Sequence, residues 1–168
     1  MPRPTSYPSR RDVASANHAL RRVDHLSQLA AVVRACPGLY VRYSAGPEKD
    51  ALHRSVDTES GLELPGLSVN PLDPEAWWTR PLEDWLARQL SQYRHLADEE
   101  PERFAWILRG EECGRGPDCE PLLRTVEPLA VLSETLLDEA RSRYAKAFDA
   151  GRGPADDTID HEDRGSSR

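Results

Sequence analysis

The sequence predicts an α+β fold, a single domain with three main helices and a small mixed, partly antiparallel sheet of four or five strands. Two observations carry this prediction: apolar residues recur at helical spacing in three stretches and alternate or run together, as in strands, in five others. The helices are predicted over residues 24–35, 81–96 and 134–150. The strands are predicted over residues 38–44, 64–70, 104–109, 120–126 and 129–132.

The apolar residues are concentrated in the middle of the chain. Residues 1–23 and 151–168 contain few large apolar side chains, and Pro2, Pro4 and Pro8 oppose regular pairing at the start. We therefore expect one folded domain over residues 24–150, a size of roughly 125 residues that is usual for a single domain. The segments before and after it are predicted to be disordered tails.

Charge and cysteine content exclude several classes of protein. The formal net charge is −7, which argues against nucleic-acid binding, because that function needs a dominant basic surface. No apolar run approaches the roughly 20 residues that span a membrane. Three cysteines, Cys36, Cys113 and Cys119, are too few for a disulfide framework, and no histidine close to Cys113 or Cys119 completes a zinc site. We expect a cytoplasmic protein without a metal.

The first helix and strand form a compact unit. Asp24 is the expected N-cap of the helix over residues 24–35, and Pro37-Gly38 ends it. The strand over residues 38–44 follows at once, with two different faces. Its apolar face carries Leu39, Val41 and Tyr43, and its polar face carries Tyr40, Arg42 and Ser44.

The segment between this strand and the second helix is broken by prolines. Residues 49–63 are predicted to be a long surface loop, with one helical turn near residues 50–53. After the strand over residues 64–70, Trp77 and Trp78 lie in a stretch that cannot form regular structure. Their rings are expected either to cover the core or to line a pocket.

The later elements carry clear end signals. Pro81 suits the first turn of the second helix, and Ser133 is the expected cap of the last one. The strand over residues 104–109 is apolar on both faces, which is typical of a central strand. Residues 110–119 are predicted to be a glycine-rich loop.

Three polar residues on successive strands form the candidate site: Arg42, Ser68 and Glu120. An arginine can hold a phosphate or carboxylate with two hydrogen bonds, and a glutamate can act on a ribose hydroxyl or an oxocarbenium-like centre. Arg115 and Gly116 lie in a glycine-rich turn whose amides could bind an anion. Tyr40 or Trp77 would supply an aromatic wall. The alternative is a structural ion pair between Arg42 and an acid such as Glu120.

The order of these three residues resembles the signature of ADP-ribosyltransferases. The resemblance implies NAD binding in a cleft of a split sheet, with Glu120 as the catalytic residue. It covers three positions only. The sequence reads Leu67-Ser68-Val69 and Asp118-Cys119-Glu120 where that family has Ser-Thr-Ser and Glu-x-Glu.

Longer segments resemble an uncharacterised actinobacterial family of unknown function over about residues 24–150. They are Gly38 to Ser44, Pro65 to Leu72, Trp77 to Trp85 and Gly114 to Leu122. This resemblance implies no activity.

Two hypotheses for the function therefore stand. The first is a non-enzymatic interaction or regulatory module that presents the Trp77-Trp78 segment to an unidentified protein partner and needs no cofactor. The second is a small enzyme or binder of a nucleotide-like anion, with NAD as its cofactor. The first is slightly favoured, because most short polar constellations are structural.

Overall fold

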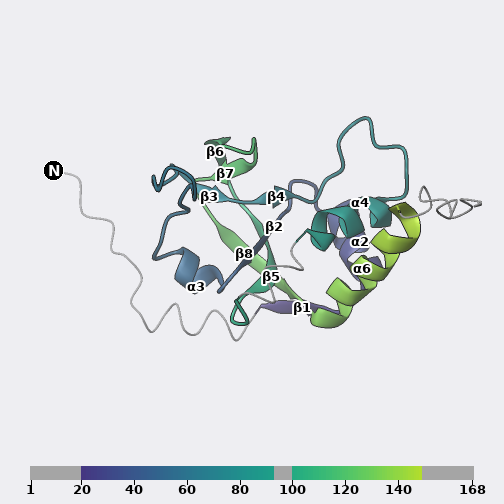
Figure 1. Ribbon diagram of the computed structural model, residues 1–168. Helices are drawn as coiled ribbons and strands as arrows, with labels where there is room; N and C mark the ends of the chain where they lie inside the picture. Colours follow the sequence, from purple (N-terminus) through teal and green to yellow (C-terminus); the bar gives the residue numbers. More distant parts are fainter. Residues whose placement is uncertain (1–19, 93–99, 149–168) are drawn as a thin grey trace, which may run out of the picture.

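A computed structural model gives the structure of the chain and describes residues 20–92 and 100–148 (Figure 1). These residues form an α+β domain, as predicted. The predicted tail segments 1–19 and 151–168, and the ends of the second and third predicted helices, lie outside the described residues.

The main sheet has five strands in the order β1-β8-β5-β2-β4. Its strands are β1 (Arg21–Val23), β2 (Tyr40–Ser44), β4 (Asn70–Pro71), β5 (Phe104–Arg109) and β8 (Glu127–Leu132). The pairing of β1 with β8 is parallel and the other pairings are antiparallel, so the sheet is mixed. As predicted, residues 104–109 form the central strand.

A second, three-stranded sheet lies over one face of the main sheet and has the order β3-β7-β6. Its strands are β3 (Leu67–Ser68), β6 (Glu112–Arg115) and β7 (Pro121–Leu123), all antiparallel. Apolar side chains of the two sheets form a small core between them. Its fully buried members include Trp106 and Leu108 of β5 and Leu123 of β7.

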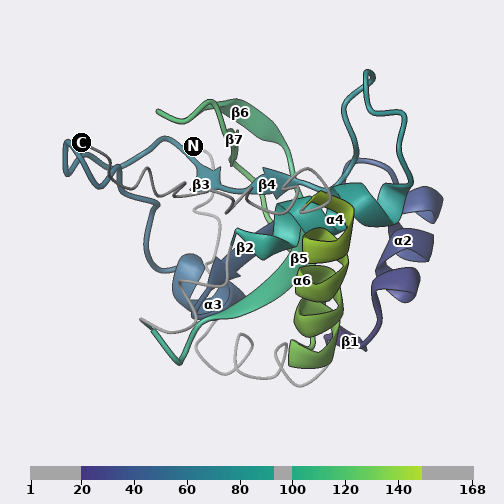
Figure 2. The same ribbon diagram turned by 45° about the vertical axis from the view of Figure 1, so that its right-hand side comes forward.

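Three helices cover the opposite face of the main sheet (Figures 1 and 2). They are α2 (Leu26–Ala35), α4 (Leu82–Ser91) and α6 (Glu134–Phe148), and a single turn, α3 (Pro47–Asp50), lies apart from them. The larger core joins these helices to Val41, Tyr43 and Ile107 of the sheet. None of the described helices is long and apolar enough to cross a membrane.

The predicted alternation of apolar and polar side chains in β2 therefore determines which layer covers each face of the main sheet. Val41 and Tyr43 face the helices, whereas Tyr40, Arg42 and Ser44 share the other face, toward the second sheet and α3. Both faces of the main sheet are covered, so Arg42 lies between layers and not on an open surface.

Several local predictions were wrong. The chain already forms β1 at Arg21, within the segment predicted to be disordered, because this strand gains a ladder with β8. The strand predicted over residues 64–70 is split into β3 and β4, which belong to different sheets. The predicted loop over residues 110–119 contains β6, and the helical turn expected near residues 50–53 lies at 47–50.

The start of α2 also differs from its prediction, because His25 and not Asp24 is the N-cap. Asp24 instead pairs with Arg22, and Gln28 accepts the backbone N–H groups of Asp24 and His25. A carboxylate from α6 completes this end of the helix. Glu139 accepts from the Leu26 N–H at 2.9 Å and from His25 Nδ1 at 2.7 Å. The cap of α6 is as predicted, since Ser133 Oγ accepts from the Leu136 N–H.

This contact between α2 and α6 predicts a pH-dependent stability. The hydrogen bond and charge of Glu139 raise the pKa of His25 above its ordinary 6.5, and His25 lowers the pKa of Glu139 below 4.5. A raised histidine pKa stabilises the fold below about pH 6.5, and this stabilisation is lost as the pH rises through the folded-state pKa.

We expect the melting temperature of the wild type to exceed that of His25→Ala by more at pH 6 than at pH 8.5. Thermal unfolding of both proteins across this range measures the difference. A difference that does not change with pH would contradict the assignment.

Candidate functional site

Arg42 is held by a bidentate ion pair with Asp50 of α3. Its Nε and Nη2 donate to the two carboxylate oxygens of Asp50 at 2.7 and 3.1 Å, and its Nη1 donates to the Ser68 carbonyl at 2.7 Å. The two side chains are only 19% and 13% exposed. Every guanidinium nitrogen of Arg42 thus already has an acceptor.

A buried serine extends this network into the main sheet. Ser44 Oγ donates to Asp50 Oδ2 at 2.5 Å and accepts from the indole N–H of Trp106 at 2.9 Å. Gly46 then turns the chain into α3 with a φ of +108°, and a Cβ there would lie 2.9 Å from the Phe104 ring. Only glycine fits this turn, and the turn carries Asp50 back over Arg42.

Glu120 stabilises the turn that joins β6 to β7. Its Oε2 accepts from the Asp118 N–H at 2.9 Å, and its Oε1 accepts from Ser68 Oγ at 3.3 Å. Gly116 packs so closely against this carboxylate that a Cβ there would collide with it. The glycine-rich turn therefore encloses a carboxylate of its own chain.

The structure brings Arg42, Ser68 and Glu120 together around Ser68, whose carbonyl bonds to Arg42 and whose hydroxyl bonds to Glu120. The alternative of a structural ion pair describes Arg42, but its partner is Asp50 and not Glu120. Asp50 was missed because it lies in a polar stretch without periodicity. The signal that could have found it is Gly46-Pro47, which predicts a turn and a helix start that return the chain toward Arg42.

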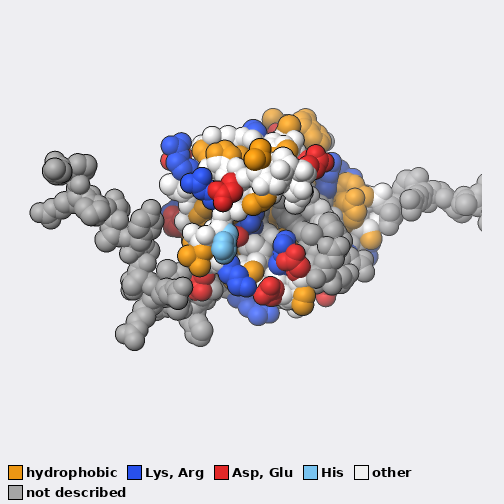
Figure 3. Space-filling view, turned by 60° about the vertical axis from the view of Figure 1, so that its left-hand side comes forward, with side chains coloured by type: hydrophobic (Ala, Val, Ile, Leu, Met, Phe, Trp, Pro, Cys, Tyr) orange, Lys and Arg blue, Asp and Glu red, His pale blue; other side chains and the backbone are white. Residues whose placement is uncertain are grey.

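Tyr40 and Arg115 lie on the same side of the main sheet as Arg42 and share an acid. The Tyr40 hydroxyl donates to Glu112 at 3.4 Å, and the Arg115 guanidinium pairs with the same carboxylate at 3.0 Å. Burial, and secondarily the Glu112 charge, raise the pKa of Tyr40. Hydrophobic and charged side chains of both signs are interspersed on the face of the molecule that carries α3 (Figure 3).

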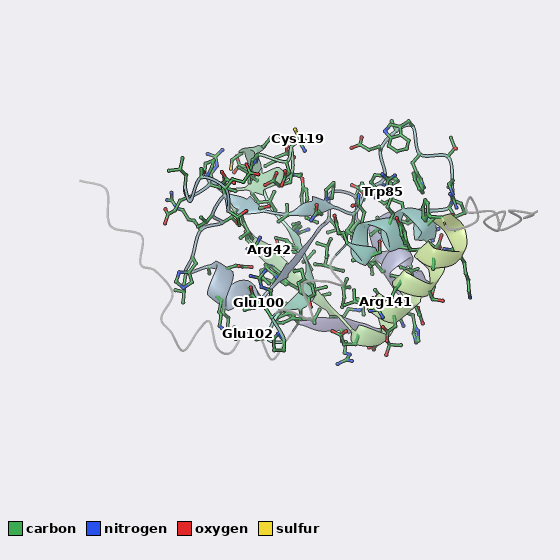
Figure 4. All side chains as sticks on the ribbon, viewed as in Figure 1. Arg42, Trp85, Glu100, Glu102, Cys119 and Arg141 are labelled. Carbon is green, nitrogen blue, oxygen red and sulfur yellow. The ribbon has the colours of Figure 1, made fainter. Side chains whose placement is uncertain are left out.

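Trp77 is not near these residues. Its ring contacts Trp85, which packs in the core on the helical side of the main sheet, whereas Arg42 lies on the other side, close to α3 (Figure 4). The structure therefore does not place Trp77 as a wall beside Arg42.

Trp77 belongs instead to an aromatic cluster that we define as Trp77, Trp78, Trp85, Tyr144 and Phe148. The three indoles meet edge to face, with ring centroids 5.2 to 6.3 Å apart. Phe148, at the end of α6, lies 6.4 Å from Trp78 and 4.8 Å from Tyr144. The loop before α4 thus joins the end of α6 in one aromatic surface.

This surface is only partly buried. Trp85 is in the core, Trp78 and Phe148 are half-buried, and Trp77 is 65% exposed. The sequence identified the tryptophans but not Tyr144 or Phe148 as their neighbours. The spacing of four residues between these two places them on one helix face, but it does not indicate which loop covers that face.

The Arg42–Asp50 pair predicts a large effect on stability. Replacing Asp50 by alanine leaves a nearly buried guanidinium without its counterion, and we expect a loss of about 3 kcal/mol in the free energy of unfolding. Lys49→Ala is the matched control, because the pair of Lys49 with Glu102 is exposed, and it should cost less than about 1 kcal/mol. Urea unfolding measures both. Equal losses in the free energy of unfolding would show that Asp50 is not needed to stabilise the nearly buried Arg42 guanidinium.

The turn around Glu120 predicts a difference between two neighbouring glycines. A Cβ at Gly116 displaces the Glu120 carboxylate, whereas a Cβ at Gly114 meets nothing within 4 Å. Gly116→Ala should destabilise the protein by about 1 to 2 kcal/mol, because the hydrogen bonds of Glu120 are lost. Gly114→Ala should be neutral within about 0.5 kcal/mol. Similar unfolding midpoints for the two variants would refute this packing.

Comparison with known proteins confirms the resemblance to a family of unknown function, whereas the actinobacterial origin of that family stays a prediction. Neither a curated protein nor a solved structure matches the chain. The sequence model of a family of unknown function, DUF6098, matches residues 16–155, which is most of the chain and includes all of the elements described above. The chain therefore belongs to DUF6098, a family of unknown function.

Proposed function

We propose that the protein is a non-enzymatic interaction module that binds a protein partner on its aromatic cluster. The observation that carries this proposal is the position of Trp77, which is 65% exposed although its ring packs edge to face against two other indoles.

An exposed tryptophan at this place is informative for two physical reasons. Tryptophan contributes more apolar area than any other side chain when a partner covers it, and tryptophan, tyrosine and arginine dominate the binding energy of protein interfaces. A ring that is already held by its neighbours loses little conformational entropy on binding, so more of the contact energy becomes affinity. The aromatic cluster supplies both conditions.

The alternative, an enzyme or binder of a nucleotide-like anion such as NAD, is not favoured by the geometry. An incoming phosphate would have to displace Asp50 from Arg42 or Ser68 from Glu120, and each of these contacts is made between partly buried groups. We therefore propose a function without a cofactor, and NAD enters only as the ligand that would support the alternative.

The location that we propose is the cytoplasm. It is supported by the three cysteines, a number that leaves at least one thiol unpaired and is typical of a reducing compartment. The net charge of −7 supports a protein partner over a nucleic acid.

The experiment compares two exposed apolar residues in different places. Trp77 and Leu62 are 65% and 68% exposed, but Leu62 lies in the loop over residues 51–63 and not in the aromatic cluster. Wild type, Trp77→Ala and Leu62→Ala are each immobilised, and the proteins that they retain from a lysate of the source organism are quantified. We expect the retained amount of at least one protein to fall about tenfold with Trp77→Ala and to stay unchanged with Leu62→Ala. A tenfold change in affinity corresponds to about 1.4 kcal/mol in binding free energy.

The retained protein must then bind the three purified proteins in the same order of affinity by calorimetry. Circular dichroism serves as the control that Trp77→Ala is folded. The proposal would be contradicted if the retained amount of every partner fell equally with Trp77→Ala and Leu62→Ala, or with neither. A rise in melting temperature with NAD or a nucleotide that disappears in Arg42→Ala would support the alternative instead.

A further inference from the structure

We propose that the partner segment bound by the aromatic cluster is an acidic, apolar peptide: an apolar side chain packs on Trp77, and a neighbouring carboxylate binds Arg80 and Arg143. This inference rests on the proposed function and names the chemistry of the partner at the same site.

The guanidinium group of Arg80 packs against two rings of the aromatic cluster. Its guanidinium carbon is 4.6 Å from the centre of the Phe148 ring and 6.0 Å from that of Trp78. It is held in this position by Asp84, which accepts from its Nε at 3.2 Å, and by the Ala147 carbonyl, which accepts from its Nη2 at 3.1 Å. An arginine fixed over aromatic rings presents a positive charge at a defined place.

Arg143 shares the same carboxylate. Its Nε donates to Asp84 Oδ1 at 2.7 Å, so that one carboxylate serves two guanidinium groups. Asp84 is 9% exposed, whereas the side chains of Arg80 and Arg143 are 43% and 41% exposed. The buried anion is therefore covered by two solvent-facing cations, and the three groups carry a net charge of +1.

The charges that surround these three groups do not remove this excess. Glu83 pairs with Arg34 at 3.0 Å and Asp138 pairs with Arg141 at 3.1 Å. Two other exposed charges in the described segments beside the cluster, Glu75 before the tryptophans and Lys146 on α6, are of opposite sign. Counted over the described residues, a net positive spot therefore lies beside an apolar surface, although the total charge of the chain is −7.

Several hydrogen-bond donors on this surface have no acceptor among the described residues. Among the described residues, Nη1 of Arg80 and both terminal nitrogens of Arg143 have no acceptor in the structure. The indole N–H of Trp85 is buried and also has no acceptor there. A partner that brings a carboxylate would satisfy the exposed guanidinium donors, and charge-assisted bonds of this kind are among the strongest in proteins.

The same arrangement discriminates against other segments. A basic segment would place like charges beside Arg80 and Arg143, which costs affinity and slows association. A purely apolar segment would cover the rings but leave the two guanidinium groups partly desolvated without new bonds. An acidic, apolar segment can both cover the aromatic rings and bind the two guanidinium groups.

The test uses three synthetic peptides that differ only in charge. Each has the same central Ile-Leu-Phe, flanked on both sides by two aspartates, two asparagines or two lysines, with blocked ends and a fluorescent label. Fluorescence anisotropy with the full chain measures the three affinities. We expect the aspartate peptide to bind at least about tenfold more tightly than the asparagine peptide and the lysine peptide to bind most weakly. Raising the salt from about 0.05 to 0.5 M should narrow this difference.

Matched variants locate the effect on the surface. Arg143→Gln should reduce the affinity for the aspartate peptide about tenfold and leave that for the asparagine peptide unchanged. Arg141→Gln is the control, because Arg141 lies on the same helix, is 41% exposed like Arg143, and has Asp138 as its own partner. Trp77→Ala should weaken both peptides alike. Equal effects of the two arginine variants would overturn the assignment of the carboxylate to Arg80 and Arg143.

The outcomes separate this inference from the proposed function. If all three peptides bind equally and Trp77→Ala abolishes their binding, the docking surface stands and its acidic preference is overturned. If no peptide binds, the inference fails, while the capture experiment with Trp77→Ala still decides the proposed function.

Two other occupants would also overturn the inference. Stronger peptide binding after replacement of Asp156, Asp157 and Asp160 by asparagine would identify the chain's own C-terminal segment as the occupant. A dimer in sedimentation equilibrium that dissociates in Trp77→Ala would identify a second copy of the chain.

Discussion

The ion pair between Arg42 and Asp50 joins three parts of the chain that are separate in sequence: the second strand of the main sheet, the one-turn helix α3, and, through the Ser68 carbonyl, the second sheet. Because Asp50 also accepts from Ser44, and Ser44 from the buried Trp106, this contact connects the polar network to the small core between the sheets. The second layer is therefore joined to the main sheet by this polar network in addition to the small apolar core between the two sheets. An arginine that performs this task has no nitrogen left for a ligand.

The polar face of β2 and the aromatic cluster lie on opposite sides of the main sheet, and the two sides differ in how far their polar groups are already bound. On the side of the second sheet, Arg42 is bound by Asp50 and the Ser68 carbonyl, and the Ser68 hydroxyl binds Glu120, so that these polar groups already have partners within the protein. On the side of the helices, the loop before α4 leaves Trp77 exposed, and Arg80 of this loop and Arg143 of α6 both bind the Asp84 carboxylate. Binding releases most free energy where a partner covers exposed apolar area and accepts from unpaired donors. The function is therefore proposed on the helical side.

How far the sequence predicts this structure differs between its parts. The α+β class, the three main helices, the central strand and the two faces of β2 follow from periodicity, because a buried face imposes its spacing on the sequence. The second sheet was missed although β3 and β7 lie within predicted strands, because the short strand β6 was predicted to be a loop and the apolar pattern of a strand does not show with which strand it pairs. The meeting of Arg42 with Ser68 was anticipated, but its partner Asp50 was not, since a side-chain pair eight residues apart depends on the Gly46 turn between them. In the same way, the spacing of Trp77 and Trp78 does not indicate that Phe148 and Arg143 complete their surface.

The measurement that tests this account most directly is a nitrogen–proton NMR titration of the full chain with the aspartate peptide and, separately, with NAD. The side-chain N–H signals of the tryptophans and of the arginine Nε groups report on the two sides of the molecule independently. The account predicts that the peptide shifts the indole signals of Trp77 and Trp78 and the Nε signal of Arg143, while the Nε signal of Arg42 stays in place with either ligand. A shift of the Arg42 signal with NAD, together with unmoved indole signals in the presence of the peptide, would contradict it.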